Sequence, residues 1–329
     1  MTKNNHINII LFLTIIIFSC SKEENPEVEV IKLPLQGIIT DKNQEISGMD
    51  WFNNHLIMLP ENLNGYLFSI PKSKIIKSIS GESKEPISPD IIKFNTPNYK
   101  KTIPGFDSFE SIAFRGFEVF ITIEVKFPDS MSAKLVRGHI DNKTLEITIP
   151  EQNFINLEIP HFIDNMSYES ILIDNNNVYT FFEANGNKVN SNPFSFLTSL
   201  NSMNTTKIGF PNIEYRITDA TRVDMNNNFW MINYYYPGDE KKLQPDSDYL
   251  TNKYILGKSH KVSKRVERLV EFKIKDNEIK ITKKLPIQLK LDKGETSRKW
   301  EALCRLEDKG FLIATDKFPT TILGYIPLK

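Results

Sequence analysis

Short apolar runs that begin and end on acidic residues recur five times along this chain of 329 residues. In each copy an acidic residue opens the first run, a turn follows, and a second run ends on an acidic or amide residue about 15 positions later. The copies are Glu45-Ile-Ser-Gly-Met to Glu61, Glu110-Ser-Ile-Ala-Phe to Glu124, Glu169-Ser-Ile-Leu-Ile to Glu183, Asp219-Ala-Thr-Arg-Val to Asn233, and Glu301-Ala-Leu-Cys-Arg to Asp316. Repetition of β-type runs over tens of residues indicates a β-propeller, whose blades surround one axis.

Each copy extends into a unit of four apolar runs. In the second copy, Ala133–Ile140 and Leu145–Ile149 follow the opening pair and are separated by the turn residues Asp141 and Asn142. Short runs divided by Asn, Asp and Gly predict antiparallel hairpins. The sequence therefore predicts an all-β propeller of five blades with four antiparallel strands each. In the first unit the outer strands are expected at Tyr66–Ile70 and Ile75–Ile79.

The fifth unit stops one strand short, because the chain ends after the run Thr321–Pro327. The run Val30–Ile39 precedes the first copy and has no blade of its own. Pairing of this N-terminal strand with the last blade would close the ring and remove two exposed sheet edges. Six blades are the alternative, with further strands in Pro86–Lys101 and around Tyr249–Val262.

One connection is much longer than the others. Pro237–Arg265 separates the second and third strands of the fourth unit. Loops of this length inside a compact domain are either functional or disordered. We expect this insertion at the same rim as Asn233, where it would cover the axial opening.

The N-terminus has the pattern of a lipoprotein signal. Residues 1–19 combine Lys3 with an apolar stretch that is shorter than the roughly 20 residues of a membrane-spanning helix. Ile17-Phe18-Ser19-Cys20 resembles a bacterial lipobox, in which Cys20 becomes the lipid-modified first residue, for example with palmitate. A cleaved soluble signal is the alternative. Residues 20–29 read as a flexible tether and 30–329 as a single propeller domain.

The tether begins Ser21-Lys22-Glu23-Glu24, which resembles the export signal of Bacteroidetes-type surface lipoproteins. The expected location is the bacterial outer membrane, through the lipid on Cys20, with the propeller at the cell surface or facing the periplasm. The 41 basic and 41 acidic residues balance, so no nucleic acid partner is expected. We expect a monomer. Cys304 is the only thiol besides Cys20 and reads as a small core residue.

The acidic residue that opens each copy is expected once per blade at one level of the axis. Carboxylates this close cannot all stay ionised without protons, basic partners or a cation. Calcium fits best because it accepts six to eight oxygen ligands in loose geometry. Equally, such residues can accept hydrogen bonds from backbone N–H groups of the next blade. The candidate metal ligands are Glu45, Glu110, Glu169, Asp219 and Glu301.

A second set of residues ends the second strand of each unit and is expected near the same opening as a ligand-binding group. Arg222 and Lys299 are added to it, because a cation combined with basic side chains suits phosphoester chemistry. No nucleophile motif is present, so catalytic residues are unassigned. The second set consists of Glu61, Glu124, Glu183, Asn233 and Asp316.

The blade openings resemble those of the phytase-like ("esterase-like activity of phytase") propeller family. The motifs that carry this are Glu45-Ile-Ser-Gly-Met with Leu59-Pro-Glu61, Glu110-Ser-Ile-Ala-Phe with Ile123-Glu124, Ile217-Thr-Asp-Ala-Thr, and Glu301-Ala-Leu with Ile313-Ala-Thr-Asp316. The layout is also similar to that of calcium-activated nucleotidases, which are five-bladed. Ser or Ala replaces the Gly that the phytase-like family has after the acidic residue.

Two functions follow as hypotheses. The first is a calcium-dependent phosphoester hydrolase, which the resemblance implies. The second is a surface lipoprotein without enzymatic activity that binds a glycan, a nutrient or a partner protein through its rim. Convergent carboxylates together with Arg222 and Lys299 in one pocket would favour the hydrolase, whereas an aromatic rim would favour binding.

Overall fold

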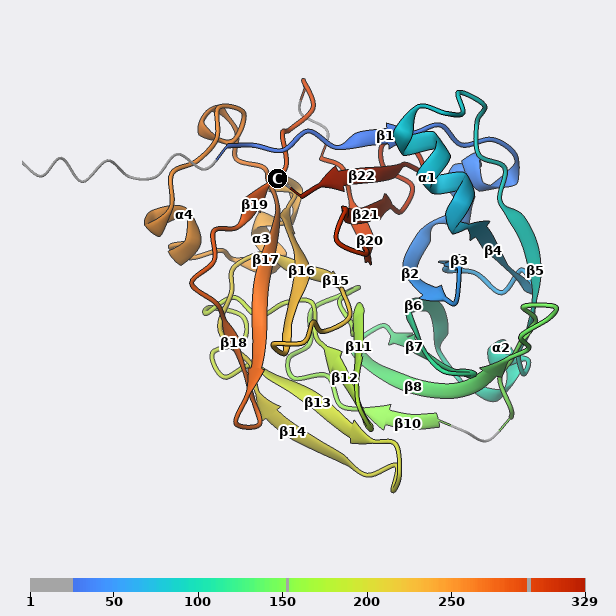
Figure 1. Ribbon diagram of the computed structural model, residues 1–329. Coiled ribbons are helices and arrows are strands. Elements are labelled where there is room, and N and C mark those ends of the chain that lie inside the picture. The colour runs from blue at the N-terminus through green and yellow to red at the C-terminus, as the bar shows by residue number, and fades with distance from the viewer. Residues whose placement is uncertain (1–25, 152–153, 295–296, 329) are drawn as a thin grey trace, which may run out of the picture.

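A computed structural model describes residues 26–151, 154–294 and 297–328. The signal at 1–19, Cys20 and the first half of the tether lie outside the described residues. The fold is all-β, with its strands in three hydrogen-bonded sheets arranged as a propeller (Figure 1). Within the described residues no helix is both long and apolar enough to span a membrane.

The strands follow one another as antiparallel meanders. The first two meanders share a nine-stranded sheet, because their outer strands β5 and β9 pair in parallel. β10 adds to the outer side of β8. The strands are β2 (Ile46–Phe52), β3 (His55–Pro60), β4 (Tyr66–Pro71), β5 (Asp90–Asn95), β6 (Phe106–Arg115), β7 (Glu118–Phe127), β8 (Ser130–Ile140), β9 (Ile147–Thr148) and β10 (Phe154–Leu157).

The next two meanders form the second nine-stranded sheet in the same way, through a parallel contact between β14 and β18. β19 pairs with β17. The strands are β11 (Ser170–Asp174), β12 (Asn177–Phe181), β13 (Phe194–Ser199), β14 (Thr205–Gly209), β15 (Arg216–Ala220), β16 (Asn228–Tyr235), β17 (Val266–Lys275), β18 (Glu278–Ile281) and β19 (Ile287–Gln288).

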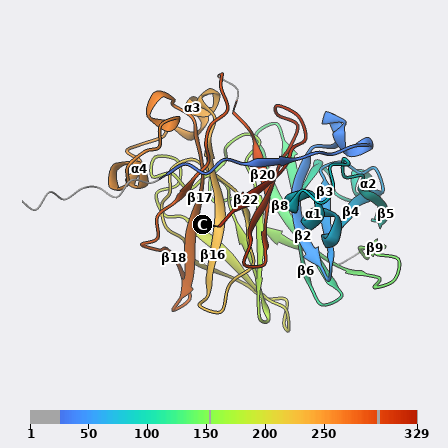
Figure 2. The same cartoon turned by 45° about the horizontal axis from the view of Figure 1, so that its top comes forward.

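The last sheet joins the two ends of the chain. It contains β20 (Trp300–Leu306), β21 (Gly310–Thr315) and β22 (Leu323–Pro327), and β1 (Ile31–Leu33) pairs with β22 as its fourth strand. The expected pairing of the N-terminal strand is therefore confirmed, and Figure 2 shows this segment running across β22. β1 covers the edge of β22 that would otherwise be exposed.

The innermost strands form a closed ring. β2 contacts β6, and the contacts continue through β11, β15 and β20 back to β2. The hydrophobic core is divided in the same way, because each buried cluster lies between two consecutive meanders. In one cluster, for example, Ile57 of β3 packs with Phe109 of β6. Strands that are buried on both faces explain why the apolar runs are nearly continuous in sequence.

The helices are short and lie in connections. They are α1 (Lys72–Ser80), α2 (Tyr99–Thr102), α3 (Glu240–Leu243) and α4 (Tyr249–Lys253), with 3-10 turns η1 (Ile38–Thr40), η2 (Lys42–Gln44), η3 (Pro237–Asp239) and η4 (His260–Val262). The strand expected at Ile75–Ile79 is wrong, since these residues belong to α1. Two isoleucines four positions apart share one face of a helix. The outer strand of the first meander is β5, inside the segment Pro86–Lys101. The segment Tyr249–Val262 holds α4 and η4 instead of a strand.

Candidate functional site

Carboxyl groups converge at one end of the axis, where the inner strands begin and the second strands end. We call this group the acidic basin. Three of its members, Glu110, Glu124 and Glu169, place carboxylate oxygens within 4.8 Å of one another, and all three are buried. Electrostatic contacts link the remaining members to these three. The basin consists of Glu45, Glu61, Asp107, Glu110, Glu124, Glu169, Glu183, Glu301 and Asp316.

A β-bulge in the inner strand determines the direction in which the basin glutamates of that strand point. Glu110 lies at the register shift between Phe109 and Ser111, and Glu301 lies at the corresponding shift after Trp300. Glu169 takes the same place in the third meander, because Glu183 N bonds to Ser167 O as Asp316 N bonds to Lys299 O. A bulge re-aims a side chain, and here it turns three glutamates toward the axis.

The other two meanders carry hydroxyl groups at this bulge. In β2 the residue is Ser47, between Ile46 and Gly48. In β15 it is Thr218, which follows Ile217. The prediction of five equivalent carboxylates is therefore wrong at two positions: Glu45 precedes the bulge residue by two positions, and Asp219 follows it by one.

Glu45 still reaches the basin, from the rim. It lies in the left-handed region with a φ of 48° at the end of η2, and its side chain is 25% exposed. Its carboxylate accepts a hydrogen bond from Lys317 Nζ at 2.8 Å and contacts Glu61. Glu45 is thus a member of the basin that is already paired with a cation.

Asp219 does not belong to the basin. Its carboxylate accepts hydrogen bonds from Ala220 N at 2.8 Å and from Leu303 N, in the next meander, at 2.6 Å. Asp50 does the same between the first two meanders, where it accepts from Phe114 N at 2.8 Å. The backbone-acceptor alternative is therefore the role that the structure gives to Asp219.

The second-strand set meets at the basin except for Asn233. The amide of Asn233 donates to Glu214 O at 2.9 Å and Arg216 O at 3.1 Å, and its oxygen accepts from Arg268 Nε at 2.8 Å. Asn233 pairs with Ile217, as Ile123 pairs with Phe109, so the residue that corresponds to Glu124 is Tyr234. The sequence pattern missed Tyr234 by one position.

Tyr234 places a hydroxyl group in the basin. The residue is fully buried, and Glu301, Glu183 and Asp316 lie close enough for their charges to raise its pKa in addition to the effect of burial. The hydroxyl has no hydrogen-bond partner among the described residues. A buried hydroxyl without a partner is costly, and that of Tyr234 is one of ten such buried side-chain atoms among the described residues.

The basic residues divide between the two ends of the axis. Arg222 is not at the basin: it binds the Asp50 carboxylate through Nε at 2.9 Å and Nη2 at 2.7 Å, and also donates to Trp51 O. These partners lie at the opposite end of β2. Lys299 is at the rim of the basin, with Nζ 3.8 Å from Asp316 Oδ2.

Arg216 is the cation that the sequence reasoning missed. It is buried at the start of β15, and it donates from Nη1 to Glu183 at 2.7 Å and from Nε to Asp239 at 2.9 Å. Asp239 belongs to the insertion 237–265, which therefore meets the rim of the basin as expected. Arg216 lies two residues before the bulge residue of its strand, as Glu45 and Lys299 do in theirs. This shared spacing was the signal in the sequence.

Burial and repulsion between neighbouring charges raise the pKa of most basin carboxyls. Burial is the larger cause throughout, and it brings the pKa of Glu110 to about 7, of Glu124 to about 10 and of Glu61 to about 11. The pKa of Glu169 and of Glu301 is also well above its usual range. The shift at Glu110 is opposed by hydrogen bonds from Ser108 and Glu169. Near neutral pH, the metal-free basin therefore holds several protons.

The donor set suits a hard divalent cation. Glu110, Glu124 and Glu169 offer only oxygen, and no His or Cys belongs to the described cluster. Calcium accepts such ligands at variable geometry, while zinc prefers nitrogen and sulfur. A cation at this place would displace protons from the carboxyl groups and remove their repulsion.

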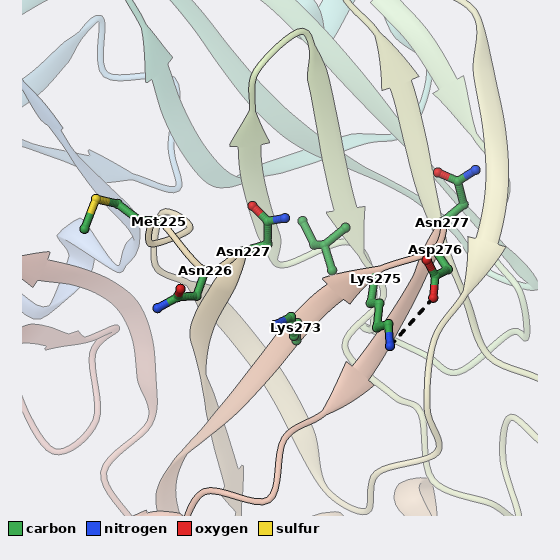
Figure 3. A pocket seen from close by; sticks show the side chains of 8 residues that line it. Met225, Asn226, Asn227, Lys273, Lys275, Asp276 and Asn277 are labelled. Carbon is green, nitrogen blue, oxygen red and sulfur yellow. Dashed lines mark ion pairs between the residues drawn. The ribbon is translucent and has the colours of Figure 1, made fainter.

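A surface hollow at the other end of the fourth meander has different chemistry. It lies between the turn after β15 and the β17–β18 hairpin, and is lined by residues such as Asn227, Lys273 and Asp276 (Figure 3). Its only ion pair among the residues drawn joins Lys275 and Asp276 at 4.0 Å, and both side chains are exposed. The side chains that line this hollow do not bring several carboxyl groups together, as those of the basin do.

Comparison with known proteins yields structural similarity only. No protein-family model and no curated protein matches the chain. Solved structures that are similar include a GH43_1 enzyme from Xanthomonas citri (10% identity, 91% of each chain, TM-score 0.49). A Bombyx mori GH32 β-fructofuranosidase mutant has 10% identity over 89% of this chain and 57% of its own, with a TM-score of 0.48. A glucose dehydrogenase has 8% identity over 90% and 99%, with a TM-score of 0.45.

These similarities do not support the resemblance to the phytase-like family, for which no family model matches. At identities of 8–10% and TM-scores below 0.5 they carry no statement about activity. The propeller description therefore rests on the strand pairing and the ring of inner strands in this chain itself.

Proposed function

We propose that this chain is a five-bladed propeller whose acidic basin binds a divalent cation, preferentially calcium, and that it acts as a cation-dependent binding protein. The observation that carries the proposal is the convergence of oxygens from Glu110, Glu124 and Glu169 within 4.8 Å. The unpartnered hydroxyl of Tyr234 supports it independently.

The inner strands support the proposal of five blades. Each of the five strands in the ring, β2, β6, β11, β15 and β20, begins a meander of four strands, and the last meander is completed by β1. The segments that would have held a sixth blade contribute β5, most of α2, α4 and η4.

Phosphoester hydrolysis is the less favoured alternative. It would require basic side chains that are free to bind a phosphate beside the cation. Arg222 lies at the other end of the axis, and Arg216 is already bound to Glu183 and Asp239. Neither guanidinium group is left beside the carboxylates to bind a phosphate, so the arrangement favours binding.

We further propose that the protein is a monomeric lipoprotein of the outer membrane, anchored through Cys20 and without a nucleic acid partner. The lipobox pattern and the balanced charge of the chain support this. Cys20→Ala should abolish the attached lipid, detected by mass spectrometry of the mature N-terminus, and release the protein from membranes. Unchanged membrane partitioning of the variant would contradict the anchor.

Calcium binding is tested by thermal unfolding with calcium or with a chelator. A ligand that binds only the folded state stabilises it by about 2.7 kcal/mol at a hundredfold excess over Kd. We expect Glu169→Gln to abolish the calcium-dependent shift without destabilising the metal-free protein, because Gln keeps the size of the side chain and adds no charge to the buried site, where the pKa of Glu169 is already well above its usual range. The matched control is Glu271→Gln, which removes a buried carboxylate outside the basin that pairs with Lys284.

The proposal fails if calcium leaves the melting temperature unchanged while Glu169→Gln destabilises the chelated protein. In that case the basin carboxyls would be structural hydrogen-bonding groups. Retention of the calcium shift in Glu271→Gln shows that loss in Glu169→Gln reflects the basin and not a general loss of acidic groups.

A further inference from the structure

A groove of about 1060 Å³ opens beside the rim of the acidic basin. One of its walls belongs to the insertion 237–265, and the other to the connection between β19 and β20. Lys299 lines the groove and lies 3.8 Å from Asp316 of the basin, but no basin carboxyl group is among the described residues of the lining. The groove is therefore a site of its own next to the basin.

Hydrogen bonds join the two walls of the groove. Leu291 N donates to Ser259 Oγ at 2.9 Å, and Arg265 donates from Nη2 to Asp292 O at 3.0 Å. Ser259 Oγ in turn donates at 2.7 Å to the carboxylate of Glu27, which fastens the insertion to the N-terminal segment. Walls that are held in place before a ligand arrives lower the entropic cost of binding.

Lysine side chains give the groove a positive charge that its own carboxylate does not balance. Lys264 stands in the wall of the insertion and Lys293 in the opposite wall; both are exposed, and neither forms an ion pair with the described residues. The carboxylate of Asp292 is the only one among the described residues of the lining. It is already paired with Lys32 at 3.1 Å and Arg298 at 3.4 Å, which lie outside the lining. Two ammonium groups, one from each wall, thus favour an anion between them.

Aromatic rings supply an apolar surface in the same groove. Tyr236 is 41% exposed and Phe318 is 43% exposed, and both line it. The Tyr236 ring lies against the backbone of Gly238, where a Cβ atom would collide with it. Lys299 Nζ lies 5.1 Å from the centroid of the Phe318 ring, a distance typical of a cation held over an aromatic face. Exposed rings in a concave site commonly cover the apolar part of a ligand.

The two kinds of lining together select the ligand. A neutral apolar molecule would take water from the ammonium groups of Lys264 and Lys293 without replacing it by an opposite charge. A small inorganic anion would leave the rings of Tyr236 and Phe318 uncovered. The volume is close to the upper end of the range of about 300–1,000 Å³ that small-molecule sites have, so one molecule with both a charged and an apolar part has room.

We propose that this groove binds an organic anion. Its acidic group, a carboxylate or a phosphate, lies between Lys264 and Lys293, and its apolar or aromatic part lies against Tyr236 and Phe318. The inference goes beyond the proposed cation site and does not depend on it, because the lining contains no described carboxyl group of the basin.

The test compares two fluorescent compounds that share one ring system. 8-Anilinonaphthalene-1-sulfonate carries a negative charge, whereas N-phenyl-1-naphthylamine is its neutral counterpart. Both are titrated into residues 20–329 with Cys20→Ala, so that no attached lipid competes for the groove. We expect the anionic compound to bind at least roughly tenfold more tightly than the neutral one, and its affinity to fall as sodium chloride is added.

Substitution of both lysines tests the charged part of the site. Lys264→Gln combined with Lys293→Gln should weaken the anionic compound roughly tenfold and leave the neutral one unchanged. The matched control is Lys100→Gln combined with Lys101→Gln, two exposed lysines of α2 outside the groove, which should change neither affinity. Because all four lysines are exposed, both double variants should keep the melting temperature of the unaltered protein.

Phe318→Ala tests the apolar part. It removes a ring that the two compounds would share, so both should bind more weakly. Displacement then identifies the acidic group: phenylacetate and phenyl phosphate are added to the bound anionic compound, with phenylacetamide as the neutral comparison. At least one of the two anions should displace it, and the stronger one shows whether the groove prefers a carboxylate or a phosphate. Phenylacetamide should not displace it at the same concentration.

Three results would overturn the inference: the neutral compound binds as tightly as the anionic one, the Lys264 and Lys293 double variant binds the anionic compound as well as the control variant does, or neither anion displaces it. The titration is repeated with calcium and with a chelator, and the affinities should be equal. Binding that occurs only with calcium would show that the groove is not a separate site. Binding without any calcium-dependent shift in melting temperature would contradict the cation site alone.

Discussion

Arg216 donates from Nη1 to the buried carboxylate of Glu183 at 2.7 Å, and this pair connects the acidic basin to the insertion. Arg216 also reaches Asp239 at 2.9 Å. Burial lowers the pKa of Arg216, but the charges of Glu183, Tyr234 and Asp239 outweigh this and raise it. Arg216 therefore stays charged and opposes the rise that burial causes in the pKa of Glu183.

Replacement of Arg216 by Met should be strongly destabilising near neutral pH. Breaking a buried ion pair typically costs about 3–5 kcal/mol, because the remaining charge has no partner. Glu183 can respond by taking up a proton, since burial already raises its pKa. The loss of stability measured by urea unfolding should thus be smaller at pH 5 than at pH 8. An equal loss at both values would show that Glu183 stays ionised without Arg216.

The metal-free protein should become less stable as the pH rises. Glu110 has an ordinary pKa of 4.5 that is raised to about 7 in the folded state. A group with a raised folded pKa gives its full stabilisation below 4.5 and loses it as the pH rises through 7. The loss is on the order of 3 kcal/mol for a shift of this size.

Glu124 and Glu61 extend the same trend to about pH 10 and 11. The measurement is the free energy of unfolding with a chelator across this pH range. Calcium should flatten the decline, because it replaces the protons. A chelated protein whose stability is constant between pH 5 and pH 8 would mean that the basin carboxyls titrate normally. Glu110→Gln serves as the comparison, since its profile should lack the part of the slope around pH 7.

The sequence predicted most of the fold because strands buried on both faces leave long apolar runs, and because turns of Asn and Asp separate them. The pairing of β1 with β22 followed from an unpaired strand at each end of the chain. The residues Ile75–Ile79 were placed wrongly because a short apolar segment does not by itself distinguish a strand from a helix.

The candidate site was predicted well in the three meanders whose bulge residue is a glutamate and poorly in the two whose bulge residue carries a hydroxyl group. Glu110, Glu169 and Glu301 were aligned correctly, but Glu45 and Asp219 were shifted by two residues and one. A shift of one residue in a strand sends the side chain to the other face, which a repeat pattern of single letters does not reveal. Arg216 depends on a contact with Asp239, 23 residues later, in an insertion that no repeat constrains.

Asp219→Ala should destabilise the fold without affecting calcium. It leaves Ala220 N and Leu303 N without their acceptor in a buried place, at a cost of about 1–3 kcal/mol for each group. The calcium-dependent shift in melting temperature should equal that of the unaltered protein, because Asp219 lies outside the basin. Loss of this shift would place Asp219 among the ligands after all. Asp50→Ala, at the same type of contact with Phe114 N, should behave alike.

If β1 closes the ring, two residues of this strand, Leu33 and Ile31, should differ in their contribution to the free energy of unfolding. Leu33 is 5% exposed and packs in the core between the first and last meanders, whereas Ile31 in the same strand is 48% exposed. Both positions pair with β22, so the backbone contribution is shared. Leu33→Ala should lower the free energy of unfolding by about 2–5 kcal/mol, and Ile31→Ala, the matched control, should change it by less than about 1 kcal/mol.

Unfolding of Leu33→Ala, followed by urea titration, should remain a single cooperative transition, because β1 joins the two ends of one ring. If Leu33→Ala instead unfolds in two steps, or is as stable as Ile31→Ala, β1 is an accessory strand and the ring is held closed by the inner strands alone.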